Sequence, residues 1–163
     1  RPRAPRARPP PRCQTELMRV YIPATVDDLP RCADGLWEPP LAYAVTDLLL
    51  EIADSDDADE LSEIARDVAA RASVIEVGSP LRVVVVAELT RAECETDPDL
   101  HPAAVRVQGR IPASAIACAF VDEPDAAEDV RHAVGGDDDA LARLEERDLL
   151  WYDASELRHV PVG

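Results

Sequence analysis

The stretch LRVVVVAEL, residues 81–89, decides the fold class of this chain. Its branched apolar residues follow one another almost without interruption, which is typical of a central strand buried on both faces of a sheet. Just upstream, apolar residues recur at helical spacing and predict a long amphipathic helix; they are Leu61, Ile64, Ala65, Val68, Ala69 and Ala72. A buried strand next to such a helix indicates a sheet that is covered by helices.

Further elements are predicted on both sides of this pair. Alternating or short apolar stretches predict strands over residues 19–25, 41–45, 104–110, 116–121 and 149–152, and residues 90–102 are expected to form a polar loop. Helices are expected over residues 26–33, after the cap residue Thr46, after Pro124 and after the acids at 137–139. This order predicts a single-domain α+β sandwich, with a mixed sheet of about five to six strands and four to five helices.

The composition narrows the function classes. The 163 residues contain 17 basic residues, all of them Arg, and 33 acids, which gives a net charge of −16. Such a charge argues against direct binding to nucleic acid or to an anionic membrane and favours a basic protein partner. The absence of Lys excludes a Schiff-base lysine. The longest apolar stretch, residues 113–121, is too short for a membrane span, and the four widely spaced cysteines suggest reduced thiols. We therefore expect a cytoplasmic protein.

Residues 1–17, RPRAPRARPPPRCQTEL, differ from the rest of the chain. Five Arg, five Pro and one Glu give this segment a net charge of +4, whereas twelve Arg and 32 acids leave residues 18–163 at −20. A segment so rich in Pro and Arg forms no packed core. We expect a disordered tail that is not part of the native protein, which would begin at Met18. A basic recognition arm or a linker is the alternative. The predicted acidic domain covers residues 18–163.

No catalytic motif is present. The six glycines cannot build a phosphate-binding loop of either common type, Ser114 lacks the glycines of a nucleophile elbow, and no two histidines are four residues apart. The acidic stretches at 54–60, 122–129 and 137–139 are explained by the preference of helix N-termini for negative charge. We therefore predict no catalytic residue, no metal site and no cofactor.

The aromatic residues give the one speculative site. Tyr and Trp combine a large apolar ring with a polar group, so they serve both packing and ligand contact. Arg19 and Tyr21 share one face of the first strand, and Trp151 or Tyr152 would lie near Arg19 if the first and last strands were neighbours. With Tyr43, these residues form a candidate ligand-binding cluster. A packing role for the rings is the alternative.

Several stretches resemble a family of small uncharacterised actinobacterial proteins. They are MRVYIPAT (18–25), AYAVT (42–46), VVVVAEL (83–89), the segment from 105 to 134, and LLWY (149–152). Members of that family open with a similar MRVYIPAT and end near a similar LLWY. The resemblance covers nearly all of residues 18–157 and implies a cytosolic actinobacterial protein that starts at Met18. No activity is assigned to the family, so the resemblance carries no catalytic residue to this chain.

These observations lead to one principal hypothesis and several alternatives. The principal one is a non-enzymatic protein-interaction or regulatory module, because a basic partner would be attracted by the charge. The first alternative is an unrecognised enzyme or small-ligand binder with a pocket at the Tyr/Trp/Arg cluster. The second is an acidic mimic of nucleic acid. Adaptation to high salt would also explain the acid content, and the sequence leaves the oligomeric state open.

Overall fold

The computed structural model describes residues 15–163, so the predicted disordered tail lies outside the described residues up to position 14. Strand β1 (Leu17–Ala24) begins one residue before the predicted start of the domain, and Leu17 pairs with Thr90. The backbone carbonyl of Glu16 accepts a hydrogen bond of 3.2 Å from the backbone N–H of Arg91. Residues 16 and 17 are therefore attached to the sheet.

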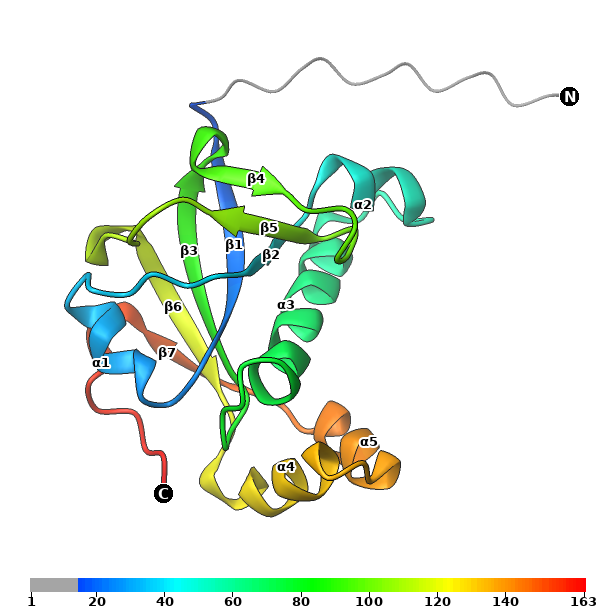
Figure 1. The fold of residues 1–163 in the computed structure, drawn as a ribbon, viewed down its shortest axis with the longest axis vertical. Helices are drawn as coiled ribbons and strands as arrows, with labels where there is room; N and C mark the ends of the chain where they lie inside the picture. The colour runs from blue at the N-terminus through cyan, green and yellow to red at the C-terminus, as the bar shows by residue number, and fades with distance from the viewer. Residues whose placement is uncertain (1–14) are drawn as a thin grey trace, which may run out of the picture.

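All seven strands of residues 15–163 belong to one sheet. They are β1, β2 (Ala42–Ala44), β3 (Val83–Thr90), β4 (Cys94–Thr96), β5 (Ala104–Val107), β6 (Ile116–Val121) and β7 (Leu150–Asp153), and their order is β4-β5-β2-β1-β3-β6-β7 (Figure 1). Every neighbouring pair is antiparallel. The α+β class is confirmed, but the predicted mixed sheet of five to six strands is wrong in direction and in number.

The helices connect these strands and explain both errors. They are α1 (Asp28–Ala33), α2 (Asp47–Ile52), α3 (Ala58–Ile75), α4 (Ala127–Val134) and α5 (Asp138–Glu146), five over the described residues. Helices α2 and α3 carry the chain from β2 to β3, but β1 lies between these two strands and opposes both. The pair α4–α5 returns the chain so that β7 runs antiparallel to β6. The extra strand, β4, lies within the predicted loop at 90–102.

Strand β3 is the interior strand that the valine run predicts. The first five residues of β3 are all buried. The strand pairs with β1 along its whole length, from Val83 opposite Ala24 to Thr90 opposite Leu17. Its residues alternate between the two faces of the sheet, as the pleat requires. Val83 and Val85 belong to one apolar cluster, and Val84 and Val86 belong to another. The sheet therefore has an apolar core on each face.

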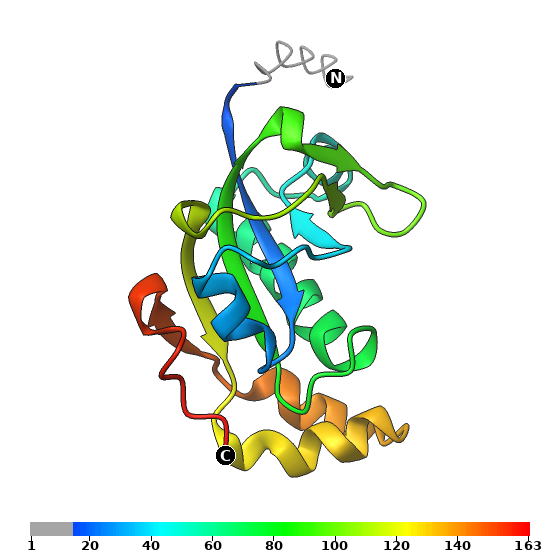
Figure 2. The same cartoon turned by 60° about the vertical axis from the view of Figure 1, so that its left-hand side comes forward.

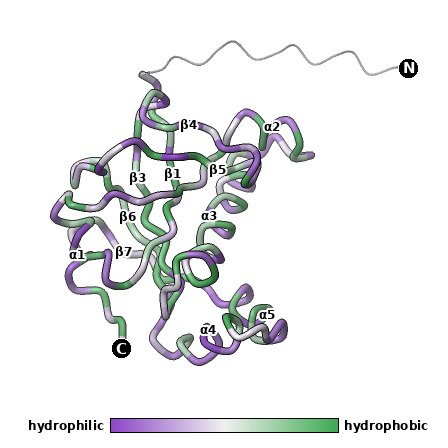
Figure 3. The backbone as a smooth tube through the Cα atoms, in the orientation of Figure 1, coloured by the Kyte–Doolittle hydropathy of each residue, from purple (hydrophilic) through white to green (hydrophobic). Residues whose placement is uncertain are grey.

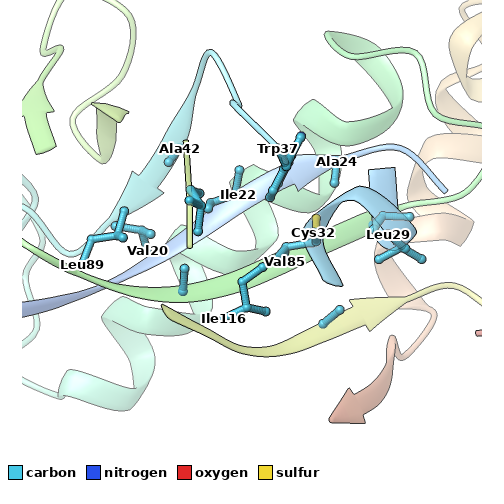
Figure 4. Packing of buried hydrophobic residues seen from close by; sticks show 14 of the residues in the cluster. Val20, Ile22, Ala24, Leu29, Cys32, Trp37, Ala42, Val85, Leu89 and Ile116 are labelled. Atoms are coloured by element: carbon cyan, nitrogen blue, oxygen red, sulfur yellow. The ribbon is translucent and has the colours of Figure 1, made fainter. Parts of the chain in front are cut away.

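Different elements cover the two faces. On the first, Leu29 and Cys32 of α1 and the buried indole of Trp37 pack over Ile22 and Val85 (Figure 4). On the second, α3 lies against β1, β2 and β3, and its buried residues Ala65 and Ala69 allow a close approach. The predicted amphipathic helix is thus confirmed, and the side chain of Asp57 caps its N-terminus.

The α4–α5 hairpin lies beyond one end of the sheet (Figure 2), and a third apolar cluster packs it against Val74 of α3 and Leu81, which precedes β3. Next to it, Arg82 and Asp122 form a buried ion pair, with 2.8 Å between Nη2 of Arg82 and Oδ1 of Asp122. The hydropathy colouring follows this arrangement, with apolar residues along the central strands and polar residues along the outer turns of the helices (Figure 3). Among the described residues, no helix has both the length and the apolar character needed to cross a membrane.

Candidate functional site

A concave groove lies on the α3 face of the sheet, where the helix leaves β6 and β7 uncovered. Its volume is about 470 Å³. Four strands and one helix contribute to its walls, which we call the Trp151 groove. Its lining residues are Arg19 and Tyr21 from β1, Asp59, Ser62, Glu63 and Arg66 from α3, Val86 from β3, Ala117, Cys118 and Phe120 from β6, and Trp151 from β7.

An irregularity in β6 shapes the floor of this groove. Val86 of β3 is opposite Cys118, but the next residue, Ala87, is opposite Ile116, so Ala117 has no partner of its own. A bulge of this kind bends the strand and turns two consecutive side chains toward the same face. Ala117 and Cys118 both pack against the α3-side cluster and line the groove.

The structure brings together three of the five residues predicted as a ligand site. Arg19, Tyr21 and Trp151 line the groove. The sequence hypothesis placed Trp151 or Tyr152 near Arg19 only if the first and last strands were neighbours, and β3 and β6 lie between these strands. Arg19, Tyr21 and Trp151 line one groove because their side chains lie on the same face of the sheet.

The other two predicted residues lie elsewhere. Tyr43 is buried opposite Tyr21, and its ring meets that of His101 edge-on at 5.9 Å between centroids. Tyr152 belongs to the opposite face, where it packs against the cluster beneath α1. Tyr43 therefore packs beside Tyr21 on the same face without lining the groove, and Tyr152 packs on the opposite face.

Two arginines in the groove have weak partners. Nη2 of Arg19 lies 3.5 Å from a Glu88 carboxylate oxygen, and Nη2 of Arg66 lies 3.5 Å from Asp67. The guanidinium of Arg66 also lies 5.3 Å from the centre of the Phe120 ring, a favourable cation–π contact. Its Nε is buried without a hydrogen-bond partner among the described residues. Leaving a buried N–H without an acceptor is energetically unfavourable.

The exposed indole of Trp151 completes the site. Its residue is 57% exposed, an unusual fraction for a large ring, whereas Trp37 is 4% exposed. On the opposite wall, α3 presents Asp59, Ser62 and Glu63 at helical spacing. The groove therefore offers a flat apolar surface, two guanidinium groups and several hydrogen-bonding groups.

Two residues of the groove are not among the predicted site residues. Phe120 belongs to the predicted apolar strand at 116–121, yet it is only half-buried and forms part of the groove. Arg66 belongs to α3 and lines the groove as well. The available signal was the polar stripe of Asp59, Ser62, Glu63 and Arg66, which follows the same helical period as the buried stripe beside it.

The thiols and the histidine near the sheet have no activated arrangement. Burial raises the pKa of Cys118, and the indole of Trp151 and the charge of Arg19 oppose that rise only in part. Burial also raises the pKa of Cys94, to about 11. Nδ1 of His101 accepts a hydrogen bond of 3.0 Å from the backbone N–H of Ala103. No group of three or more His, Cys, Asp or Glu within residues 15–163 could hold a metal ion.

Two other cavities help to define the site. One of about 380 Å³ shares Arg19, Tyr21 and Ser62 with the Trp151 groove and extends it across β1 toward α2. Another, of about 300 Å³, lies between α3 and α5. In this second cavity Arg82 is paired with Asp122 in the protein interior, and Arg71 lies 3.8 Å from Glu145. The Trp151 groove is the better candidate because it has the larger volume, about 470 Å³, and contains an exposed indole.

The fold and the groove define a small antiparallel α+β domain with a concave groove beside the β7 edge of its sheet. The chain belongs to a family of unknown function (DUF6912), whose model matches residues 18–160. The resemblance to a domain of unknown function is thus confirmed. Neither the curated proteins nor the solved structures yielded a match to this chain.

Proposed function

We propose that this chain is a non-catalytic binding protein whose ligand occupies the Trp151 groove. The observation that carries the proposal is the exposed indole of Trp151 in the same groove as Arg19 and Arg66, two guanidinium groups with weak partners. The ligand class is a small molecule with a flat apolar part and an anionic group. The apolar part would pack on the indole, and the anion would accept hydrogen bonds from the arginines.

The lining of the groove supports binding rather than catalysis. Cys118 is the thiol in the groove, and its raised pKa keeps it protonated at neutral pH. The hydroxyl groups in the groove belong to Ser62 and Tyr21, and none of the described histidines lines the groove to act as their base. The residues that converge there are suited to holding a ligand and to selecting it by shape and charge.

The dye 8-anilinonaphthalene-1-sulfonate tests this proposal, because it combines flat rings with one sulfonate. We expect one dye per chain, and about tenfold weaker binding for Arg66→Gln and Trp151→Ala, as the loss of one charge-assisted hydrogen bond or one ring contact predicts. Arg131→Gln is the matched control, because Arg131 is exposed on α4 and lies 3.9 Å from Glu128. Equal dye affinity in the groove variants and the control would contradict the proposal.

The protein-interaction function predicted from the sequence is a second proposal, favoured by the open strand β7 at the edge of the sheet. The nucleic-acid mimic finds less support, because many acids have local structural partners. Asp57 and Asp137 cap α3 and α5, and Asp129 binds Arg143 and Arg147. Acids used in this way favour a structural origin for much of the negative charge.

A further inference from the structure

The two edges of the sheet differ in how they are protected. Strand β4 is three residues long and carries the exposed charge of Glu95. Such shortness and charge are common devices that prevent pairing with another chain. Strand β7 has four residues and ends at Asp153, but its first two residues are apolar and exposed, Leu150 at 40% and Trp151 at 57%. This exposed apolar segment carries no charge of its own and is suited to pairing with an added strand.

The hydrogen bonds around β7 show which backbone groups point outward. The N–H of Asp153 binds the Glu156 carboxylate at 2.7 Å, and the N–H of Asp122, beyond the end of β6, binds the carbonyl of Arg82 at 3.0 Å. Neither N–H is then used between β6 and β7, so Leu150 and Tyr152 are the β7 residues that bond to β6. In an antiparallel pair the bonding residues alternate. The backbone N–H and C=O of Trp151 therefore point to the open edge.

The charge near this edge suggests what would pair there. Asp148 precedes β7, and Asp153 and Glu156 follow its apolar residues. Residues 18–163 as a whole carry a net charge of −20, so two copies of the chain repel each other and a basic segment is attracted. We propose that β7 binds an extended basic segment of a partner protein, which adds an eighth strand to the sheet. This surface is independent of the arginines in the Trp151 groove.

A blocked peptide of alternating lysine and valine serves as the probe for this edge. We expect saturable binding, measured by the fluorescence anisotropy of the labelled peptide, and slower hydrogen exchange at the Trp151 amide. N-methylation of the peptide amides that face β7 should weaken binding about tenfold, because it removes backbone hydrogen bonds between the peptide and β7. Glutamate in place of lysine should weaken it further.

Variants of the full chain locate the binding. Trp151→Lys puts a protecting charge on the edge and should abolish peptide binding, whereas Leu100→Lys, at a residue 56% exposed in the loop between β4 and β5, should not. Arg66→Gln should leave the peptide affinity unchanged, so this inference and the proposed ligand site can fail separately. Equal affinity for the N-methylated peptide would overturn strand addition. If the chain instead forms a dimer without peptide, and the Trp151 amide is protected from exchange in that dimer, a second copy of the chain occupies the edge. That result would overturn the proposal of a basic partner segment.

Discussion

Replacement of Asp122 by Ala should destabilise the fold more than any change to a surface acid. The Asp122 side chain is 1% exposed and that of Arg82 is 7% exposed. The Asp122 carboxylate accepts bonds from Arg82 Nε at 3.0 Å, Nη2 at 2.8 Å and backbone N at 2.9 Å. The variant would leave the guanidinium buried without its counter-charge. Breaking a buried pair in this way costs about 3–5 kcal/mol, a large part of the stability of an ordinary domain.

Urea unfolding at neutral pH, followed by far-ultraviolet circular dichroism, measures this loss. Asp125→Ala is the matched control, because Asp125 also binds an arginine, Arg147 at 3.1 Å, but its side chain is 73% exposed. A surface pair of that kind contributes about 0–1 kcal/mol. The double variant Arg82→Met with Asp122→Ala should be more stable than the sum of the single losses implies, since it leaves neither charge buried alone.

A loss of stability in Asp122→Ala no greater than that in Asp125→Ala would contradict this expectation. That result would mean that water reaches Arg82 in the folded chain, or that the hairpin α4–α5 moves to expose it. The slope of the unfolding free energy against urea separates these cases. A reduced slope would indicate a folded state that already exposes the end of the sheet, and an unchanged slope would indicate local solvation of the guanidinium.

Three further predictions concern other parts of the chain. Ser73→Ala should cost about 1–3 kcal/mol in thermal or urea unfolding, because the buried Ser73 hydroxyl donates to β1 at 2.6 Å and accepts from β3 at 2.9 Å. Burial, and after it the charge of Glu93, raises the pKa of Cys94 from 9.0 to about 11. Iodoacetamide should therefore alkylate Cys94 slowly at pH 9 and faster as the pH approaches 11. The contribution of the raised pKa to stability is present below pH 9 and is lost between pH 9 and pH 11. The hydrogen bond from Arg143 lowers the pKa of the Asp129 carboxyl below its usual range. The contribution of this carboxylate to stability should be lost as the pH falls through the lowered pKa. Arg143→Gln should raise the titration midpoint of Asp129 in an NMR titration.

Local patterns predicted the elements of this fold better than their arrangement. The valine run and the apolar stripe of α3 each require burial along a fixed period, so their identities follow from residues that are adjacent in sequence. Thr46 caps α2 as predicted, with its Oγ1 accepting from Leu49 N at 3.1 Å. Strand direction depends instead on which strands meet across the sheet. No pattern of neighbouring residues indicates that β1 lies between β2 and β3. Strand β4 has only three residues, which is too short a stretch for an alternating pattern to predict it.

The candidate site was predicted in part for a similar reason. The side-chain chemistry of Arg19, Tyr21 and Trp151 favours a ligand site. The alternation of side chains along a strand places Arg19 and Tyr21 on one face of the sheet. Whether Trp151 and Tyr152 face the same side as Arg19 depends on the pairing of β7 with β6, which the sequence does not specify. Arg66 reaches the groove because α3 crosses the sheet at this point, and that contact is likewise non-local.

The proposed anionic ligand would interact mainly with the charges that line the groove. At physiological salt, charges more than about 8 Å apart are largely screened unless they are buried, and strands are about 4.8 Å apart. Acids on α5 and around β4 therefore act weakly across the sheet, and the balance between Arg19 and Arg66 on one side and Asp59 and Glu63 on the other acts on a ligand that lies against Trp151. The same screening affects the β7 edge differently, since a long basic segment meets many acids in succession. Binding of such a segment should consequently weaken with salt more steeply than binding of a small anion, and this difference separates the two surfaces even though they share Trp151.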